Sequence, residues 1–272
     1  MKKNFRVVCL LALLLTVRSV WSATVTNIAV PSPAMKKDIS VTVILPKVYH
    51  LGGAHLPVLY LLHGYSDNNQ TWAAGTSIKE LADQYGIIVV CPDGGYSSWY
   101  FDSPVDPVWR YETFMAKELV AYVDGHYQTL PKRESRAITG QSMGGHGAMF
   151  LSIRHPDVFS VVGCLSGGVD LRPFPDQWDI AKRLGNFKDF PDRWSSNSVI
   201  TLASNLPPGE LAISIDCGAD DFFITVNRSL HQLLLTRQVP HDYTERPGGH
   251  NWEYWSNAVK YQMLFISNHL TR

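Results

Sequence analysis

Residues 136–154 read RAITGQSMGGHGAMFLSIR, and this stretch decides how the rest of the chain is interpreted. Its first four residues favour a strand, and the small and apolar residues after Ser142 favour a helix. The G-x-S-x-G pattern Gly140–Gly144 therefore falls on a strand-to-helix turn. Such a turn holds its serine in a strained backbone conformation and presents the hydroxyl at the carboxyl end of the strand. Ser142 is thus the candidate nucleophile.

Outward from this turn, short apolar runs alternate with segments of helical periodicity. The expected strands are 41–45, 57–62, 87–91, 136–140, 161–165, 211–217 and 241–244. The expected helices are 77–85, 110–123, 144–153, 226–235 and 252–270. Strands that are apolar on both faces need helices on both sides of the sheet. The pattern therefore predicts an α/β fold with a doubly wound, mostly parallel sheet.

The proline-rich interval 167–210 interrupts this alternation. We interpret it as an insert over the sheet edge within one domain, 23–272, because 272 residues with 45% hydrophobic content suit a single α/β core. Charge is balanced, with 24 Lys+Arg against 24 Asp+Glu, so no nucleic-acid partner is expected. No stretch reaches the roughly 20 apolar residues of a membrane-spanning helix.

Residues 1–22 resemble a signal peptide. Lys2, Lys3 and Arg6 precede the apolar run 7–17, and Ser22 suits cleavage; a buried N-terminal helix is the alternative. Cleavage would leave 20 basic residues against 24 acidic ones, a net charge of −4. Cys9 lies inside the apolar run rather than after it, so no lipid anchor is expected. The predicted location is secreted or periplasmic.

Three cysteines follow the leader, and each ends an apolar run: Cys91, Cys164 and Cys217. We expect buried free thiols, with a single disulfide as the alternative. The chain has no Cys-x-x-Cys pair, no metal-spaced His/Asp set and no phosphate or dinucleotide fingerprint. Neither a metal nor a cofactor is therefore expected.

A serine nucleophile needs an imidazole to accept its proton and a carboxylate to orient that imidazole. Both partners are expected after Ser142, on loops that follow later strands. The candidate bases are His155, His231, His241, His250 and His269, of which His250 alone lies in a loop between a final strand and a final helix. The acid is expected in the segment 217–222, CGADDF, where spacing leaves Asp220 and Asp221 both open.

Acyl transfer also needs two hydrogen-bond donors for the oxygen that becomes negative. The segment His63-Gly64-Tyr65-Ser66 follows the apolar run 57–62 directly. The expected donors are the N–H groups of Tyr65 and Met143. We interpret His63 as a support for this loop. We expect His146 to pack beneath the strand-to-helix turn at Ser142, which is called the elbow below.

The chain resembles the Putative esterase family of α/β-hydrolases. That family includes S-formylglutathione hydrolases, tributyrin-type, feruloyl and acetylxylan esterases, and mycolyltransferases. The segments that carry the resemblance are LLHGYSDN at 61–68, SWYFDSP at 98–104, GQSMGGHGA at 140–148, DCGADDF at 216–222 and PGGHNWEYW at 247–255. The resemblance implies an α/β-hydrolase fold, Asp221 rather than Asp220 as the acid, and an oxyanion hole at Tyr65 and Met143.

The predicted function is that of a secreted serine carboxylesterase that cleaves short-chain acyl, acetyl or feruloyl esters, free or linked to plant polysaccharide. Aromatic residues flank the motifs, and Trp178 in the insert is the candidate substrate contact. The alternatives are an acyltransferase, an S-formylglutathione-type thioesterase, and a carbohydrate-binding protein with a vestigial site. The sequence leaves the oligomeric state open.

Overall fold

The predicted sheet is present in the computed structural model, which describes residues 22–272. Within these residues its strands are arranged in the order β1-β2-β4-β3-β5-β6-β7-β8. Their bounds are β1 (Thr24–Ser32), β2 (Lys37–Leu45), β3 (Val58–Leu62), β4 (Ile88–Pro92), β5 (Arg136–Gly140), β6 (Val161–Leu165), β7 (Ala212–Gly218) and β8 (Asp242–Arg246). Strand β2 is antiparallel to both of its neighbours, whereas β4, β3 and β5 to β8 are parallel. The predicted mostly parallel α/β sheet is therefore confirmed.

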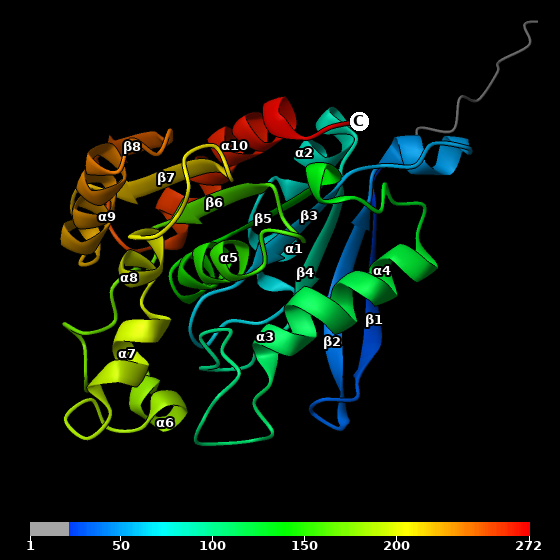
Figure 1. Ribbon diagram of the computed structural model, residues 1–272. Coiled ribbons are helices and arrows are strands. Elements are labelled where there is room, and N and C mark those ends of the chain that lie inside the picture. Colours follow the sequence, from blue (N-terminus) through cyan, green and yellow to red (C-terminus); the bar gives the residue numbers. More distant parts are fainter. Residues whose placement is uncertain (1–21) are drawn as a thin grey trace, which may run out of the picture.

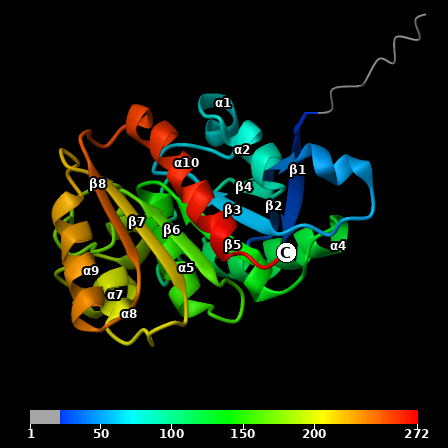
Figure 2. The same cartoon turned by 90° about the horizontal axis from the view of Figure 1, so that it is seen from above.

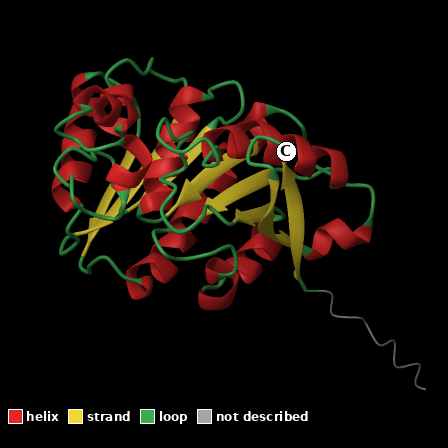
Figure 3. Cartoon of the chain, turned by 90° about the horizontal axis from the view of Figure 1, so that it is seen from below, coloured by secondary structure: helices red, strands yellow, loops and turns green. Residues whose placement is uncertain are grey.

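Helices cover both faces of this sheet (Figures 1 and 3). One face carries a continuous helical segment made of α3 (Tyr111–Thr113), a π-helical stretch (Phe114–Leu119) and α4 (Val120–His126), followed by α5 (Met143–Arg154) and α9 (Ile224–Thr236). The other face carries α1 (Thr71–Gly75), α2 (Ile78–Tyr85) and α10 (Trp252–His269). Helix α10 packs on β6 and β7 (Figure 2). Two apolar cores result, one on each side of the sheet.

Two parts of the fold differ from the sequence-based expectation. Strand β1 was not predicted, because only Val30 and Ser32 of its nine residues are buried and no apolar run marks it. The second difference is the interval 167–210, for which no helix was predicted. It contains the short helices α6 (Ile180–Leu184), α7 (Pro191–Asn197) and α8 (Val199–Ala203). Short 3-10 turns also form at Lys47–Leu51 and Arg133–Ser135. The predicted leader lies outside the described residues, except for Ser22.

All three cysteines of the described chain are buried and free. Burial raises the pKa of Cys91 and of Cys164 to about 12, so both thiols stay protonated at neutral pH. This agrees with the expectation of free thiols that pack as small apolar groups. No helix among residues 22–272 is long and apolar enough to cross a membrane.

His146 lies beneath the start of α5, fully buried among three aromatic rings. Its ring centroid lies 5.4 Å from those of Trp99 and Phe101 and 5.7 Å from that of Phe150. Its Nδ1–H donates to the Gly168 carbonyl at 3.0 Å. Burial lowers the pKa of His146 to about 3, because an imidazolium would lose its hydration there. The position beneath the elbow is the one that the sequence predicted.

This burial predicts an acid-sensitive fold. The unfolded chain takes up a proton at His146 near pH ~6.5, whereas the folded chain does so only near pH 3, so the free energy of unfolding falls as pH decreases between these values. The His146 contribution reaches at most about 1.4 kcal/mol per pH unit. Urea unfolding of wild type and His146→Gln from pH 7 to pH 4 measures it. The glutamine does not titrate, so the variant should show the shallower pH dependence; equal slopes would contradict the prediction.

Candidate active site

The predicted turn at Ser142 is present between β5 and α5. Ser142 has φ 57° and ψ −118°, a conformation that a residue with a Cβ rarely adopts. A Cβ added to Gly144 would lie 2.6 Å from the Leu62 carbonyl oxygen, so only glycine lets α5 begin this close to β3. The Ser142 N–H donates to the Leu165 carbonyl at 2.9 Å, which ties the turn to the end of β6.

The structure brings Ser142, His250 and Asp221 together in one hydrogen-bonded chain. The Ser142 Oγ lies 2.8 Å from His250 Nε2. On the other side of the ring, His250 Nδ1 lies 2.8 Å from Oδ2 and 3.0 Å from Oδ1 of Asp221. The three residues come from three separate loops, and the distances suit proton transfer from serine to imidazole.

The structure also distinguishes the two neighbouring carboxylates. The Asp221 side chain is completely buried, and its Oδ1 accepts a hydrogen bond from the Phe223 N–H at 2.8 Å. Asp220 is exposed, and its backbone N–H, not its carboxylate, bonds to the Gly248 carbonyl at 2.9 Å. Of the two carboxylates left open by spacing, the one that contacts His250 is therefore Asp221.

Aromatic rings hold the His250 imidazole in place. Its ring centroid lies 4.1 Å from that of Phe222, 5.3 Å from that of Phe223 and 4.8 Å from that of Trp255. Trp255 meets the imidazole edge-on, at an interplanar angle of 89°. These contacts limit rotation of the ring, so that its two nitrogens stay directed at Ser142 and Asp221.

The predicted oxyanion hole consists of two backbone N–H groups, those of Met143 and Tyr65. Met143 is the first residue of α5, where an N–H has no partner within the helix. Tyr65 lies in the loop after β3 and borders the cleft that contains Ser142. Within residues 22–272 neither N–H is paired with a backbone or side-chain acceptor. Both donors are thus available to an oxygen that develops negative charge.

The loop that carries Tyr65 is fixed from below by His63. This ring is buried; its Nε2 accepts a hydrogen bond from the Gly94 N–H at 2.7 Å, and its Nδ1 donates to the Gly64 carbonyl at 2.8 Å. Tyr100 donates its hydroxyl to the His63 carbonyl at 3.0 Å. His63 does not contact the triad, so it supports the loop, as the sequence analysis inferred.

Sequence analysis missed a second support, which links this loop to the elbow. The Gln141 side chain is buried and donates through Nε2 to Oδ2 of Asp67 at 2.8 Å. A Cβ on Gly64 would lie 2.5 Å from Gln141 Oε1, so the amide packs directly on the loop. Partial burial raises the pKa of Asp67. The link joins the two backbone segments that carry the Tyr65 and Met143 N–H groups.

A cleft of about 250 Å³ opens above the serine. Its lining is largely aromatic: Tyr65, Trp178, Phe222, Trp252 and Trp255. Trp178 comes from the insert, as predicted, and stacks on Phe222 with centroids 5.4 Å apart and planes 17° apart. Phe222 was not predicted, although it directly follows Asp221 in the sequence. No group of three or more metal-ligating side chains occurs among residues 22–272.

The link between Gln141 and Asp67 predicts a graded response to substitution. Asp67→Leu removes the acceptor, so the two segments that carry the N–H groups can separate. Asp67→Asn keeps an oxygen acceptor for Gln141 Nε2. Loss of one oxyanion donor costs about 10²–10³ in kcat, and a displaced donor should cost about tenfold. We expect Asp67→Leu to lower kcat about tenfold with KM little changed, and Asp67→Asn to stay near wild type. Equal losses in both variants, measured by steady-state kinetics, would contradict this role.

Comparisons with known proteins agree with this geometry. The model of the family described as Putative esterase matches residues 32–265. An acetyl esterase of Caldicellulosiruptor saccharolyticus is 27% identical over 253 residues, covering 84% of this chain and 92% of the relative. The diacylglycerol acyltransferase/mycolyltransferase Ag85A of Mycobacterium tuberculosis is 36% identical over 272 residues, covering 85% of this chain and 78% of the relative.

Solved structures show the same likeness. A ferulic acid esterase superposes with a TM-score of 0.80 and 29% sequence identity, covering 91% of this chain and 98% of the other. An S-formylglutathione hydrolase of Staphylococcus aureus has a TM-score of 0.79 at 22% identity, which shows the common fold. The family match spans most of the chain, and the sheet order and the elbow are those of the α/β-hydrolase fold. The chain therefore belongs to the Putative esterase family and is an esterase.

Proposed function

We propose that the protein is a secreted serine carboxylesterase that removes a short acyl group, or one aromatic acyl group such as feruloyl, through an acyl-enzyme. The observation that carries the proposal is the unbroken hydrogen-bonded chain from Ser142 through His250 to the buried carboxylate of Asp221. Its serine end lies in the aromatic cleft, where an ester can reach it.

In the first half of the reaction, Ser142 Oγ attacks the ester carbonyl while His250 Nε2 accepts the serine proton. The carbonyl oxygen becomes negative and receives hydrogen bonds from the N–H groups of Tyr65 and Met143. Asp221 stabilises the imidazolium that forms. The C–O bond to the alcohol then breaks, His250 gives its proton to the departing alkoxide, and the acyl group stays on Ser142.

In the second half, water takes the place of the alcohol. His250 accepts a proton from this water as its oxygen attacks the acyl carbon, and the same two N–H groups stabilise the second negative oxygen. The bond to Ser142 Oγ breaks and His250 returns the proton to that oxygen. The acid leaves and the starting enzyme is regenerated without any cofactor.

The size of the cleft favours a small acyl group. Its volume of about 250 Å³ lies below the ~300–1,000 Å³ usual for sites that enclose drug-sized ligands, so a long acyl chain would extend out of it. Trp178 and Phe222 offer flat apolar surfaces to an acetyl methyl group or a cinnamoyl ring. The acetyl esterase and ferulic acid esterase relatives support the same choice of acyl group.

Residues 1–22 support export of the enzyme, because a basic start, an apolar run and a small residue before Ala23 form a signal-peptide pattern.

The second candidate function is acyl transfer, favoured by the 36% identity to the mycolyltransferase Ag85A. An acyltransferase passes the acyl group from Ser142 to a sugar hydroxyl instead of water. The ratio of free acid to sugar ester, measured with added oligosaccharide, distinguishes the two functions.

The serine mechanism predicts that Ser142→Ala lowers kcat on p-nitrophenyl acetate and methyl ferulate by about four to six powers of ten. Folding should be unchanged, since alanine keeps the backbone of the turn. Ser66→Ala is the matched control, because Ser66 borders the same cleft without contacting His250. A fluorophosphonate should label wild type at Ser142 alone. An active Ser142→Ala enzyme, or labelling of another serine, would refute the assignment.

The neighbouring aspartates provide a matched pair of variants. Asp221→Asn removes the charge that stabilises the imidazolium and should lower kcat by about a thousandfold or more. Asp220→Asn changes an exposed side chain that does not contact His250, so kcat should stay within about tenfold of wild type. Each isosteric change removes one negative charge. A severe loss in Asp220→Asn would show that the acid had been assigned to the wrong residue.

A further inference from the structure

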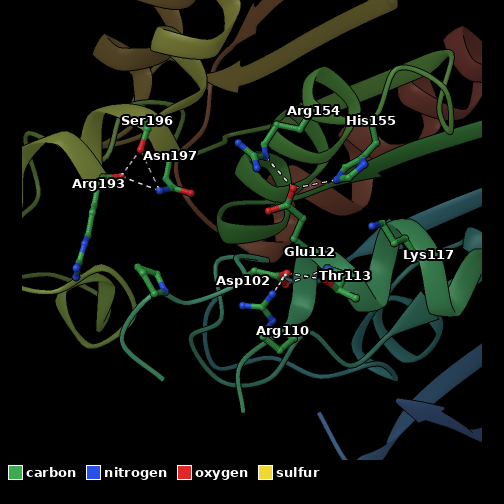
Figure 4. Close-up of a pocket in the computed structure, with 11 residues that line it drawn as sticks. Asp102, Arg110, Glu112, Thr113, Lys117, Arg154, His155, Arg193, Ser196 and Asn197 are labelled. Carbon is green, nitrogen blue, oxygen red and sulfur yellow. Dashed lines mark hydrogen bonds and ion pairs between the residues drawn. The ribbon is translucent and has the colours of Figure 1, made fainter. Parts of the chain in front are cut away.

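A groove larger than the cleft lies away from the triad of Ser142, His250 and Asp221. This groove has a volume of about 660 Å³ and is bordered by the loop 102–110, the start of α3, the π-helical stretch, the end of α5 and helix α7 (Figure 4). Ser142 immediately precedes α5, whereas Arg154 and His155 of the groove lie at its other end. Since α5 has 12 residues, about 18 Å of helix separates the groove from the serine.

The groove is positively charged overall. Four permanent cations border it (Arg110, Lys117, Arg154 and Arg193), and two carboxylates oppose them (Asp102 and Glu112). The formal net charge is therefore +2 with His155 neutral, although the full chain has a net charge of zero. An excess of one sign in a concave surface concentrates the opposite charge from solution.

Protein partners already occupy both carboxylates. Oδ2 of Asp102 lies 3.0 Å from an Arg110 nitrogen, and both Asp102 oxygens also accept hydrogen bonds from Thr113. Glu112 Oε1 accepts from Arg154 Nε at 2.7 Å and lies 2.9 Å from His155 Nε2 (Figure 4). The remaining two cations have no carboxylate partner among residues 22–272 and are available to an anionic ligand.

Lys117 and Arg193 are these unneutralised cations. The exposed Lys117 ammonium has no hydrogen bond or ion pair with any of residues 22–272. Arg193 donates one hydrogen bond to the Leu184 carbonyl at 3.3 Å and packs over the Phe190 ring, but no carboxylate contacts it. The two residues stand on different walls, Arg193 on α7 and Lys117 on the helix that follows α3 (Figure 4). A ligand that neutralises both must span the groove.

Neutral polar groups complete the lining. Asn197 uses its Nδ2 to bond to the Arg193 carbonyl at 2.7 Å, which leaves Oδ1 of the amide for a ligand, and Ser196 adds a hydroxyl. Apart from the imidazole of His155, no aromatic ring of the described chain borders the groove. Sites for single-stranded nucleic acid stack bases on aromatic side chains, which this groove does not offer. This lining suits a ligand with hydroxyl donors as well as negative charges.

We propose that this groove binds an acidic oligosaccharide that carries carboxylates on successive or nearby sugar units. The sugar carboxylates pair with Lys117 and Arg193, while sugar hydroxyls donate to the two acceptors without a partner in the described chain, Oε2 of Glu112 and Oδ1 of Asn197. Inorganic polyphosphate would bring negative charge but, when fully ionised, no hydroxyl donor for Glu112 and Asn197. Binding at this distance from Ser142 holds an acidic polymer on the enzyme without occupying the cleft. That last consequence rests on the proposed function, whereas binding itself does not.

The test measures binding separately from catalysis. Isothermal titration of the Ser142→Ala protein with trigalacturonic acid at pH 7.5 should show one site whose affinity falls as NaCl is raised. The double variant Lys117→Glu/Arg193→Glu should bind about tenfold more weakly or worse. The matched control is Arg237→Glu/Lys260→Glu, which makes the same charge change at exposed positions outside the groove and should bind like the parent.

Each result decides the proposal. Equal binding of a neutral trisaccharide such as xylotriose, equal weakening in both double variants, or tighter binding of inorganic triphosphate would overturn it. In the Ser142-containing enzyme, Lys117→Glu/Arg193→Glu should hydrolyse p-nitrophenyl acetate at the parent rate, which shows that the variant is folded. Loss of glycan binding with this hydrolysis intact supports the groove. Activity that survives Ser142→Ala would refute the proposed mechanism and leave the binding result unaffected.

Discussion

The close approach of α5 to the sheet is the constraint on which the site depends. Ser142 keeps a positive φ of 57° because the helix begins directly against the backbone of β3 and β6, at Gly144 and Gly145. Any side chain at Gly145 would place a Cβ 2.9 Å from the Leu165 carbonyl oxygen and move the helix outward. An unpaired Met143 N–H beside the serine, a Ser142 side chain that borders the cleft and a buried His146 all follow from this one packing arrangement.

The other two members of the triad are positioned mainly by backbone pairing. The loop after β7 and the loop after β8 bind each other, since the N–H groups of Ala219 and Asp220 donate to the carbonyls of Arg246 and Gly248 at 2.8 and 2.9 Å. Beneath them Asp216 is buried and accepts from Arg246 and from the Tyr254 hydroxyl. This backbone pairing sets the separation of the two segments that carry Asp221 and His250, and the aromatic rings around His250 then fix its side chain.

Local patterns were enough to predict seven of the eight strands, the main helices, and the loops that bring Ser142 and His250 together. Strand β1 could not be predicted because an edge strand with most side chains in solvent has no apolar run. Spacing could not choose between Asp220 and Asp221, since their difference is burial, a property of the folded chain. The Gln141–Asp67 link joins residues 74 positions apart, and a single sequence carries no signal for such a pair.

The two ends of α5 illustrate how one element can contribute to two different environments. At its start, the unpaired Met143 N–H and the partial positive charge of the helix dipole lie next to Ser142, which suits an oxyanion. At its end, where the dipole is negative, Arg154 supplies a cation that offsets it and leads into the groove. Because the helix is rigid and buried along most of its length, the groove and the serine keep a fixed separation. A polymer held in one could therefore present its esters to the other only at a defined distance along its chain.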